Sequence, residues 1–109
     1  MAKVIPVEEL RRSPRAALFQ GRDDAPVSIF ITQYQRDQGP DLHFHPYPEV
    51  FVVHAGTARF TVGDEELVVG EGNIVIVPAE TVHGFKCAGD DTLRVMAVHP
   101  SPEVIQTDL

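Results

Sequence analysis

Short runs of apolar residues that alternate with polar ones, separated by glycine or proline, fill most of this 109-residue chain. Runs of this kind, rich in Val, Ile, Phe and Thr, are typical of β-strands. Turns with glycine recur at a spacing of about ten residues, which is typical of antiparallel sandwiches and barrels. We therefore predict nine strands: Ala16 to Phe19, Val27 to Gln35, Leu42 to His45, Glu49 to His54, Ala58 to Val62, Glu66 to Val69, Asn73 to Val77, His83 to Cys87 and Leu93 to His99.

Two of these segments, EVFVV over residues 49–53 and NIVIVP over residues 73–78, are apolar on both faces. A sheet with one face in water alternates more regularly, so these strands are expected to face a barrel interior on one side and a second layer or a subunit contact on the other. The pattern predicts an all-β fold with an N-terminal extension over residues 1–26, a barrel over 27–99 and a C-terminal tail over 100–109. Only the segment VEELRR near the start suggests a helical turn.

Composition and charge exclude several classes of function. A chain of 109 residues is long enough for one domain, and no apolar run approaches the roughly 20 residues that a membrane-spanning helix needs. The net charge of -7 argues against nucleic acid as a partner, because that recognition depends on clustered Lys and Arg. The start of the chain has no apolar signal-peptide core, and Cys87 is the single cysteine, so we expect a cytoplasmic protein.

The segment HFHPYPEVFVV over residues 43–53 carries the clearest chemistry. His43 and His45 are two apart on a predicted strand and therefore point to the same face. Glu49 begins the next strand and points to that same interior if it shares a face with Phe51. A buried carboxylate without a partner costs several kcal/mol. A divalent cation held by these three side chains would remove that cost.

His83 is the best candidate for a further ligand, because it begins a strand after the apolar segment NIVIV and a turn. Three histidines and one glutamate occupy four positions of a six-coordinate ion and leave two positions open. Open positions are typical of a catalytic metal site and not of a structural one.

These residues follow a known pattern. The chain resembles the cupin superfamily, whose first motif runs Gly, five residues, His-x-His, three or four residues, Glu, six residues, Gly. Here His43, His45, Glu49 and Gly56 match, while Asp37 takes the leading glycine position. The second motif runs Gly, five residues, Pro-x-Gly, two residues, His, three residues, Asn. Here Gly72, Pro78 and His83 match, while Glu80 and Cys87 replace the second glycine and the asparagine.

The resemblance covers roughly residues 27–99 and implies a double-stranded β-helix, or jelly-roll barrel. It also implies one divalent transition metal, namely Fe, Mn, Ni, Co, Cu or Zn, bound by His43, His45, Glu49 and His83. The Glu80 replacement affects the conformation of one turn, because glycine is usually found where φ is positive.

Five further residues are candidates for a role in the site. His54 and His99 are expected to be surface or strand-end residues, with a ligand role as the alternative. Cys87 is expected as a small apolar residue of the pocket or core, with a redox or ligand role as the alternative. Tyr47 either packs in the Pro-flanked corner or uses its hydroxyl to bind substrate. Gln33 is expected to support a ligand histidine from the pocket wall, on strand parity alone.

The expected pocket is apolar, since Phe51, Val53 and Phe85 share the ligands' face, whereas Lys86 and Arg94 fall on the opposite one. Pockets for acidic or phosphorylated substrates usually present Arg or Lys. We therefore expect a small neutral or aromatic substrate that chelates the metal through oxygen. A redox-active ion would support dioxygenase chemistry like that of the quercetin dioxygenase-like cupins. A redox-inert ion would support Lewis-acid isomerisation, lyase or hydrolytic chemistry, in which Glu49 could serve as a base.

Two alternatives stay open at this point. One is a non-enzymatic cupin that binds a small molecule, although the chain has no helix-turn-helix pattern for transcriptional regulation. The other concerns assembly. Strands that are apolar on both faces suggest a homodimer, in which a partner covers part of the barrel with help from the segment around Phe19 and the tail EVIQTDL.

Overall fold

The computed structural model describes all 109 residues, and its strands follow the alternation of the sequence. All nine predicted strands are present, each within one residue of the expected bounds at both ends. A tenth strand of two residues near the C-terminus was not predicted. The strands are β1 (Ala16–Gln20), β2 (Ser28–Tyr34), β3 (His43–Phe44), β4 (Glu49–Ala55), β5 (Thr57–Val62), β6 (Glu65–Gly70), β7 (Asn73–Val77), β8 (His83–Cys87), β9 (Leu93–His99) and β10 (Thr107–Asp108).

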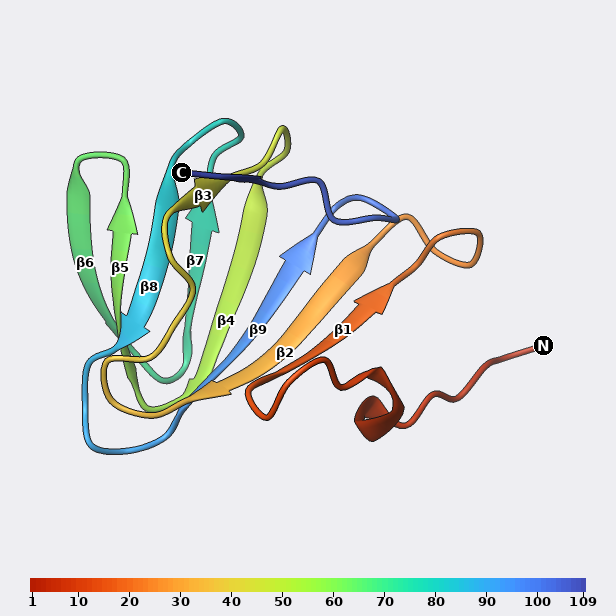
Figure 1. Cartoon of the computed structure of the whole chain (residues 1–109), viewed down its shortest axis with the longest axis horizontal. Coiled ribbons are helices and arrows are strands. Elements are labelled where there is room, and N and C mark those ends of the chain that lie inside the picture. The colour runs from red at the N-terminus through yellow and green to blue at the C-terminus, as the bar shows by residue number, and fades with distance from the viewer.

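Two five-stranded antiparallel sheets face each other (Figure 1). The first has the order β1-β2-β9-β4-β7 and the second has the order β10-β3-β8-β5-β6. Consecutive strands of the chain cross between the sheets, as from β4 to β5 and from β7 to β8, which is the arrangement of a jelly roll. The predicted all-β double-stranded β-helix is confirmed.

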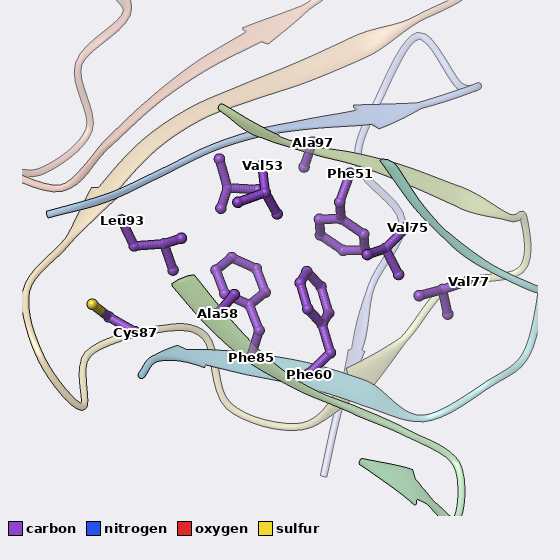
Figure 2. Packing of buried hydrophobic residues seen from close by; sticks show 11 residues of the cluster. Phe51, Val53, Ala58, Phe60, Val75, Val77, Phe85, Cys87, Leu93 and Ala97 are labelled. Atoms are coloured by element: carbon purple, nitrogen blue, oxygen red, sulfur yellow. The ribbon is translucent and has the colours of Figure 1, made fainter. Parts of the chain in front are cut away.

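The hydrophobic core lies between the inner faces of the two sheets (Figure 2). Its centre is formed by Phe51 of β4, Phe60 of β5 and Phe85 of β8, whose ring centroids lie 4.9 to 5.6 Å apart. Tilted and edge-on aromatic contacts at this separation each add about 0.5–1.5 kcal/mol to the burial of area. Phe51 also lies 5.8 Å from the ring of His83, so the aromatic core supports the side chains described below.

The outer face of the first sheet is apolar across all five strands. Two rows of directly paired residues cross it. One row is Ile76, Val50, Val98, Ile29 and Phe19, and the other is Ile74, Val52, Met96, Ile31 and Ala17. The N-terminal segment covers one end of this face, where Ile5, Val7 and Leu10 border a hollow with residues of β1 and β2. At the other end, Ile74 and Ile76 remain 64% and 66% exposed.

Both ends of the chain add to the sheets. Strand β1 lies within the segment predicted as an N-terminal extension and pairs with β2 over its full length. Strand β10 lies within the predicted tail and pairs with β3, which places the C-terminal segment beside the predicted metal ligands (Figure 1). The helical turn expected near the start is the 3₁₀ helix η1 (Val7–Leu10). No helix in the structure has the length and hydropathy of a membrane-spanning segment.

Candidate metal centre

Four side chains converge at one end of the space between the sheets. His43 and His45 come from β3 and its end, Glu49 from the first position of β4, and His83 from the first position of β8. One ligand atom from each of the four lies within 4.8 Å of the others, and all four residues are buried. The structure thus brings together all four predicted ligands, from strands of both sheets.

Backbone carbonyl groups orient the three histidines. The Nδ1–H of His43 donates to the Asp41 carbonyl at 2.6 Å, that of His45 to the Ile105 carbonyl at 2.8 Å, and that of His83 to the Thr81 carbonyl at 2.8 Å. A carbonyl oxygen can only accept, so each of these Nδ1 atoms carries the hydrogen. In a neutral ring each Nε2 then keeps its lone pair, which is the form that binds a metal, whereas in a protonated ring Nε2–H donates to Glu49, which faces Nε2 of His83 at 2.9 Å.

Glu49 is the anionic centre of this cluster. Its Oε1 atom lies 2.9 Å from Nε2 of both His45 and His83. Burial alone would raise the pKa of the Glu49 carboxyl, but its contacts with the imidazoles outweigh burial and hold that pKa well below its ordinary value of 4.5. Glu49 is therefore an ionised carboxylate. A buried negative charge of this kind needs a positive partner, and a divalent cation would supply it.

A divalent ion fits this donor set. The Nε2 atom of His45 is buried and has no well-directed hydrogen-bond partner, although Oε1 of Glu49 is close. Burial lowers the pKa of His43, which favours its neutral, metal-binding form. For His45 burial also favours the neutral form, but the contacts with Glu49 and the Ile105 carbonyl raise its pKa overall. Imidazole nitrogen and carboxylate oxygen are ligands that Fe, Mn, Co, Ni, Cu and Zn all accept.

His99 differs from the prediction. It was expected at the surface or at a strand end, and it is the last residue of β9, but only 1% of the residue is exposed and it lies at the cluster. Its Nε2 atom is 3.0 Å from Oε2 of Glu49, and its ring centroid is 4.6 Å from that of His45. The alternation of β9 carries the missing signal, because Leu93, Val95, Ala97 and His99 all face inward. His54, also expected at the surface, is exposed.

Tyr47 contacts His45 and His99 of the cluster but does not line the cavity. Its ring stacks on that of His45, with centroids 5.1 Å apart and planes inclined by 4°. Its hydroxyl lies 2.7 Å from Nδ1 of His99 and accepts a hydrogen bond from the Ile105 backbone N–H at 3.2 Å. The hydroxyl is therefore engaged within the protein, which agrees with the packing role for this residue, and a contact with substrate stays a prediction.

A cavity of about 210 Å³ adjoins the metal centre. It opens between the sheets, and His43, Glu49 and His99 form its polar wall. No Lys or Arg side chain lines it, as the strand parity predicted. Its lining residues are Ala16, Phe30, Thr32, Tyr34, Pro40, His43, Glu49, Phe51, Phe85, Ala97, His99 and Gln106.

Two of the five predicted pocket residues, Phe51 and Phe85, line the cavity. Val53 and Cys87 also point inward, but they lie farther along their strands in the hydrophobic core and do not reach it. Figure 2 shows the Cys87 sulfur at the margin of this core. Gln33 was placed on the wrong face, because its side chain contacts Arg94 and the Pro14 carbonyl on the outer surface.

Two residues replace glycine in the motifs and still adopt its conformation. Asp37 has a φ of 65° and Glu80 a φ of 61°, both in the left-handed region that favours glycine. The turn of Glu80 keeps its contact with the site, since the Glu80 N–H donates to the carbonyl of His45 at 2.8 Å. Glu80 therefore adopts the backbone conformation that favours glycine, and the expected consequence is a lower conformational stability of this turn.

Comparisons with known proteins agree with this fold. An uncharacterized protein of Streptomyces coelicolor is 42% identical over 59 residues, which are 54% of this chain and 55% of the relative. The fold is similar to an oxalate decarboxylase of Bacillus subtilis with Mn(II) centres, at a TM-score of 0.80, 17% identity, and coverage of 90% of this chain and 29% of that one.

A recombinant oxalate oxidase in complex with glycolate matches at a TM-score of 0.72 and 16% identity, over 88% of this chain and 56% of that one. This chain therefore spans between about a third and a half of the length of these proteins. The sequence pattern of the cupin domain matches residues 30–99, which hold all four predicted ligands and His99. The chain belongs to the cupin family, and within it the buried cluster of His43, His45, Glu49 and His83 has the ligand atoms that could hold a metal ion.

Proposed function

We propose that this cupin is a metal-dependent dioxygenase that acts on a small, neutral or aromatic molecule with two neighbouring oxygen atoms. The observation that carries the proposal is the cavity, which joins an imidazole and carboxylate cluster to a wall of Phe30, Phe51 and Phe85 without a single Lys or Arg. A dianionic or phosphorylated substrate would find no cationic side chain there.

The size of the cavity narrows the substrate further. About 210 Å³ is below the range of about 300–1,000 Å³ that is usual for drug-sized ligands. A diketone or a single-ring diphenol is therefore favoured over a flavonoid with several rings. Aromatic walls exclude water and bury the apolar part of such a molecule, while its oxygen atoms face His43, Glu49 and His99.

The residues present would hold the ion through three neutral imidazoles and one carboxylate. When bound, a divalent ion supplies Lewis-acid polarisation of a substrate oxygen, and a redox-active one also supports oxygen chemistry. The protein's own contribution is the fixed orientation of the ligands by the carbonyls of Asp41, Thr81 and Ile105. Because these acceptors are backbone groups, the ligand geometry depends little on side-chain motion.

The likeness to oxalate decarboxylase and oxalate oxidase supports chemistry on small oxygen-rich molecules at a cupin metal centre, at the level of the fold. The alternatives are a Lewis-acid isomerase or lyase and a cupin that only binds its ligand. Oxygen uptake separates all three, because an isomerase changes the substrate without consuming oxygen and a binding protein leaves it unchanged.

The test begins with elemental analysis of protein purified without added metal. Protein loaded with that metal is then mixed with catechol, acetylacetone and a panel of related diphenols and diketones, while oxygen uptake and product mass are followed. We expect uptake with at least one compound, and none with the His83→Ala variant. Conversion without uptake would establish the Lewis-acid alternative, and binding without conversion would establish the binding protein.

We also propose that the protein is a homodimer, with a second copy seated on the uncovered end of the apolar outer face of the first sheet. The two rows on that face contain no charged residue, whereas the whole chain carries a net charge of -7. Two acidic copies can therefore meet on this face without opposing their carboxylates. Exposed isoleucines on the edge strand β7 make the same region unfavourable in water.

A further inference from the structure

His99 is the buried titratable residue at the metal centre that the ligand set leaves out. Its Nε2 atom has no well-directed hydrogen-bond partner, although Oε2 of Glu49 lies 3.0 Å away. A buried polar atom without a hydrogen-bond partner destabilises a folded protein, so its role needs an explanation. The question is whether this nitrogen is a fifth metal ligand or a hydrogen-bond donor.

The partner of Nδ1 distinguishes His99 from the three ligand histidines. In His43, His45 and His83, Nδ1 faces a backbone carbonyl, which can only accept a hydrogen bond. In His99, Nδ1 faces the hydroxyl of Tyr47 at 2.7 Å, and a hydroxyl can donate. The second nitrogen of an imidazole takes the opposite role to the first, so these partners determine what each Nε2 can do.

The hydrogen bonds of Tyr47 decide the direction of that contact. The Ile105 backbone N–H lies 3.2 Å from the Tyr47 hydroxyl oxygen and can only donate to it. The hydroxyl hydrogen needs an acceptor of its own, and Nδ1 of His99 is the acceptor within reach. Tyr47 therefore donates to Nδ1, and the hydrogen of the neutral His99 ring is on Nε2. In this tautomer Nε2 has no lone pair for a metal.

The two oxygens of Glu49 face different kinds of nitrogen as a result. Oε1 lies beside the Nε2 atoms of His45 and His83, which point to the metal position, and Oε2 lies beside Nε2 of His99. We propose that His99 is a positioning residue whose Nε2–H lies against Oε2 of Glu49, 3.0 Å away, and keeps that oxygen from the metal, so that the carboxylate offers only Oε1. The remaining coordination positions then stay open to the cavity, which His99 also lines.

This inference needs the metal centre but not the oxygen chemistry proposed above. It is tested with metal alone and without substrate. The role of His99 could therefore hold if the protein is not a dioxygenase, and the protein could be a dioxygenase if His99 has another role. Its first prediction concerns the native protein and requires no variant. In zinc-loaded protein labelled with ¹⁵N, NMR spectra that correlate ring nitrogens with ring protons should place the hydrogen on Nδ1 for His43, His45 and His83, and on Nε2 for His99.

The result that would overturn the inference is a His99 ring that carries its hydrogen on Nδ1 and has its Nε2 bound to zinc. A Tyr47→Phe variant tests in a second way which nitrogen of His99 carries the hydrogen. Without the donating hydroxyl, we expect the Nδ1–H tautomer of His99 to become populated. An unchanged tautomer in that variant would contradict the role given to Tyr47.

Cobalt reports on the coordination of Glu49. We expect His99→Leu to bind one Co²⁺ per chain but to show an altered visible absorption spectrum, since Oε2 is then free to bind the ion. His99→Gln should restore the native spectrum, because its side-chain amide donates a hydrogen bond. His54→Leu, at an exposed position, is the matched control. A native spectrum in His99→Leu, or a loss of cobalt as large as in His83→Ala, would overturn the inference.

Discussion

His43 and His83 lie directly opposite each other on the neighbouring strands β3 and β8, with ring centroids 4.5 Å apart. Directly paired residues on one face of an antiparallel sheet have their Cβ atoms about 4.5–5.5 Å apart. The register of two strands therefore sets the distance between two of the metal ligands. Backbone pairing therefore brings these two ligands together without help from an ion.

Replacing His83 by alanine should abolish stoichiometric metal binding. Loss of a group that merely orients a ligand reduces metal affinity by about 10–100-fold, and loss of the ligand itself should cost more. We expect less than one tenth of the native metal content by elemental analysis. Added metal should also no longer raise Tm, because a ligand stabilises a protein only as far as it binds. Unchanged metal content would show that the ligand set is wrong, and His54→Ala should behave as the native protein.

Replacing Gly39 by alanine should displace the loop that leads to His43. A Cβ atom at Gly39 would lie 2.0 Å from the carbonyl oxygen of Phe85, which is a backbone atom and cannot turn aside. Lys86 holds the same loop by donating to the carbonyl of Gly39 at 2.6 Å and to Asp41 at 2.9 Å. We expect a loss of at least about 1–3 kcal/mol in the free energy of unfolding, together with weaker metal binding.

The control for this change is Gly70→Ala, because a Cβ atom at Gly70 meets nothing within 4 Å. Its stability should stay within about 0.5 kcal/mol of the native protein, as is usual for surface substitutions. Denaturant unfolding and calorimetric titration with metal measure the two effects. Equal stability of the two variants would contradict the close packing of this loop on β8.

The sequence was sufficient for nine of the ten strands and for the four residues of the candidate metal site, and the reason is physical. A β-strand and a metal site of this type both leave local patterns, in the alternation of apolar residues and in the spacing of His43, His45 and Glu49. His99 was missed because its role depends on which strands become neighbours. It reaches Glu49 only through the pairing of β9 with β4, which no local pattern encodes.

Gln33 was misplaced for a related reason. On β2 Phe30 faces inward together with the polar Ser28 and Thr32, while Ile29 and Ile31 face outward. Because both faces carry large apolar residues, alternation cannot tell which one is buried. The sequence also could not predict how deep the cavity is. Val53 and Cys87 point to the predicted face, but they lie too far along their strands to line the cavity.

Tyr34 should make the protein less stable in alkali. Burial raises the pKa of the Tyr34 hydroxyl above its ordinary value of 10.0. Above that pH the unfolded chain loses this proton while the folded protein keeps it, so the free energy of unfolding falls as pH rises. Tyr34→Phe should reduce that fall, as measured by urea unfolding from pH 8 to 11. An identical slope in the variant would show that Tyr34 ionises freely in the folded protein.

Replacing Glu80 by glycine should stabilise the protein. Glu80 holds a φ of 61°, where a side chain costs about 1–2 kcal/mol and glycine costs nothing sterically. Part of that gain is offset because glycine makes the unfolded chain more flexible, so we expect a net gain of about 0.5–1 kcal/mol and a Tm higher by a few degrees. Glu71→Gly is the control, since Glu71 does not have a positive φ, and it should not stabilise.

The proposed dimer makes a prediction about mass. One chain has a mass of 12.0 kDa, so light scattering of the native protein should give about 24 kDa, twice that value. Ile74→Arg places a charge in the middle of the uncovered apolar rows and should give a folded monomer, because a charge without a partner is costly to bury in an interface. Asp64→Arg, in the exposed turn between β5 and β6 of the other sheet, should remain dimeric. A native protein that scatters as a monomer, or an Ile74→Arg variant that stays dimeric, would place the contact elsewhere or remove it.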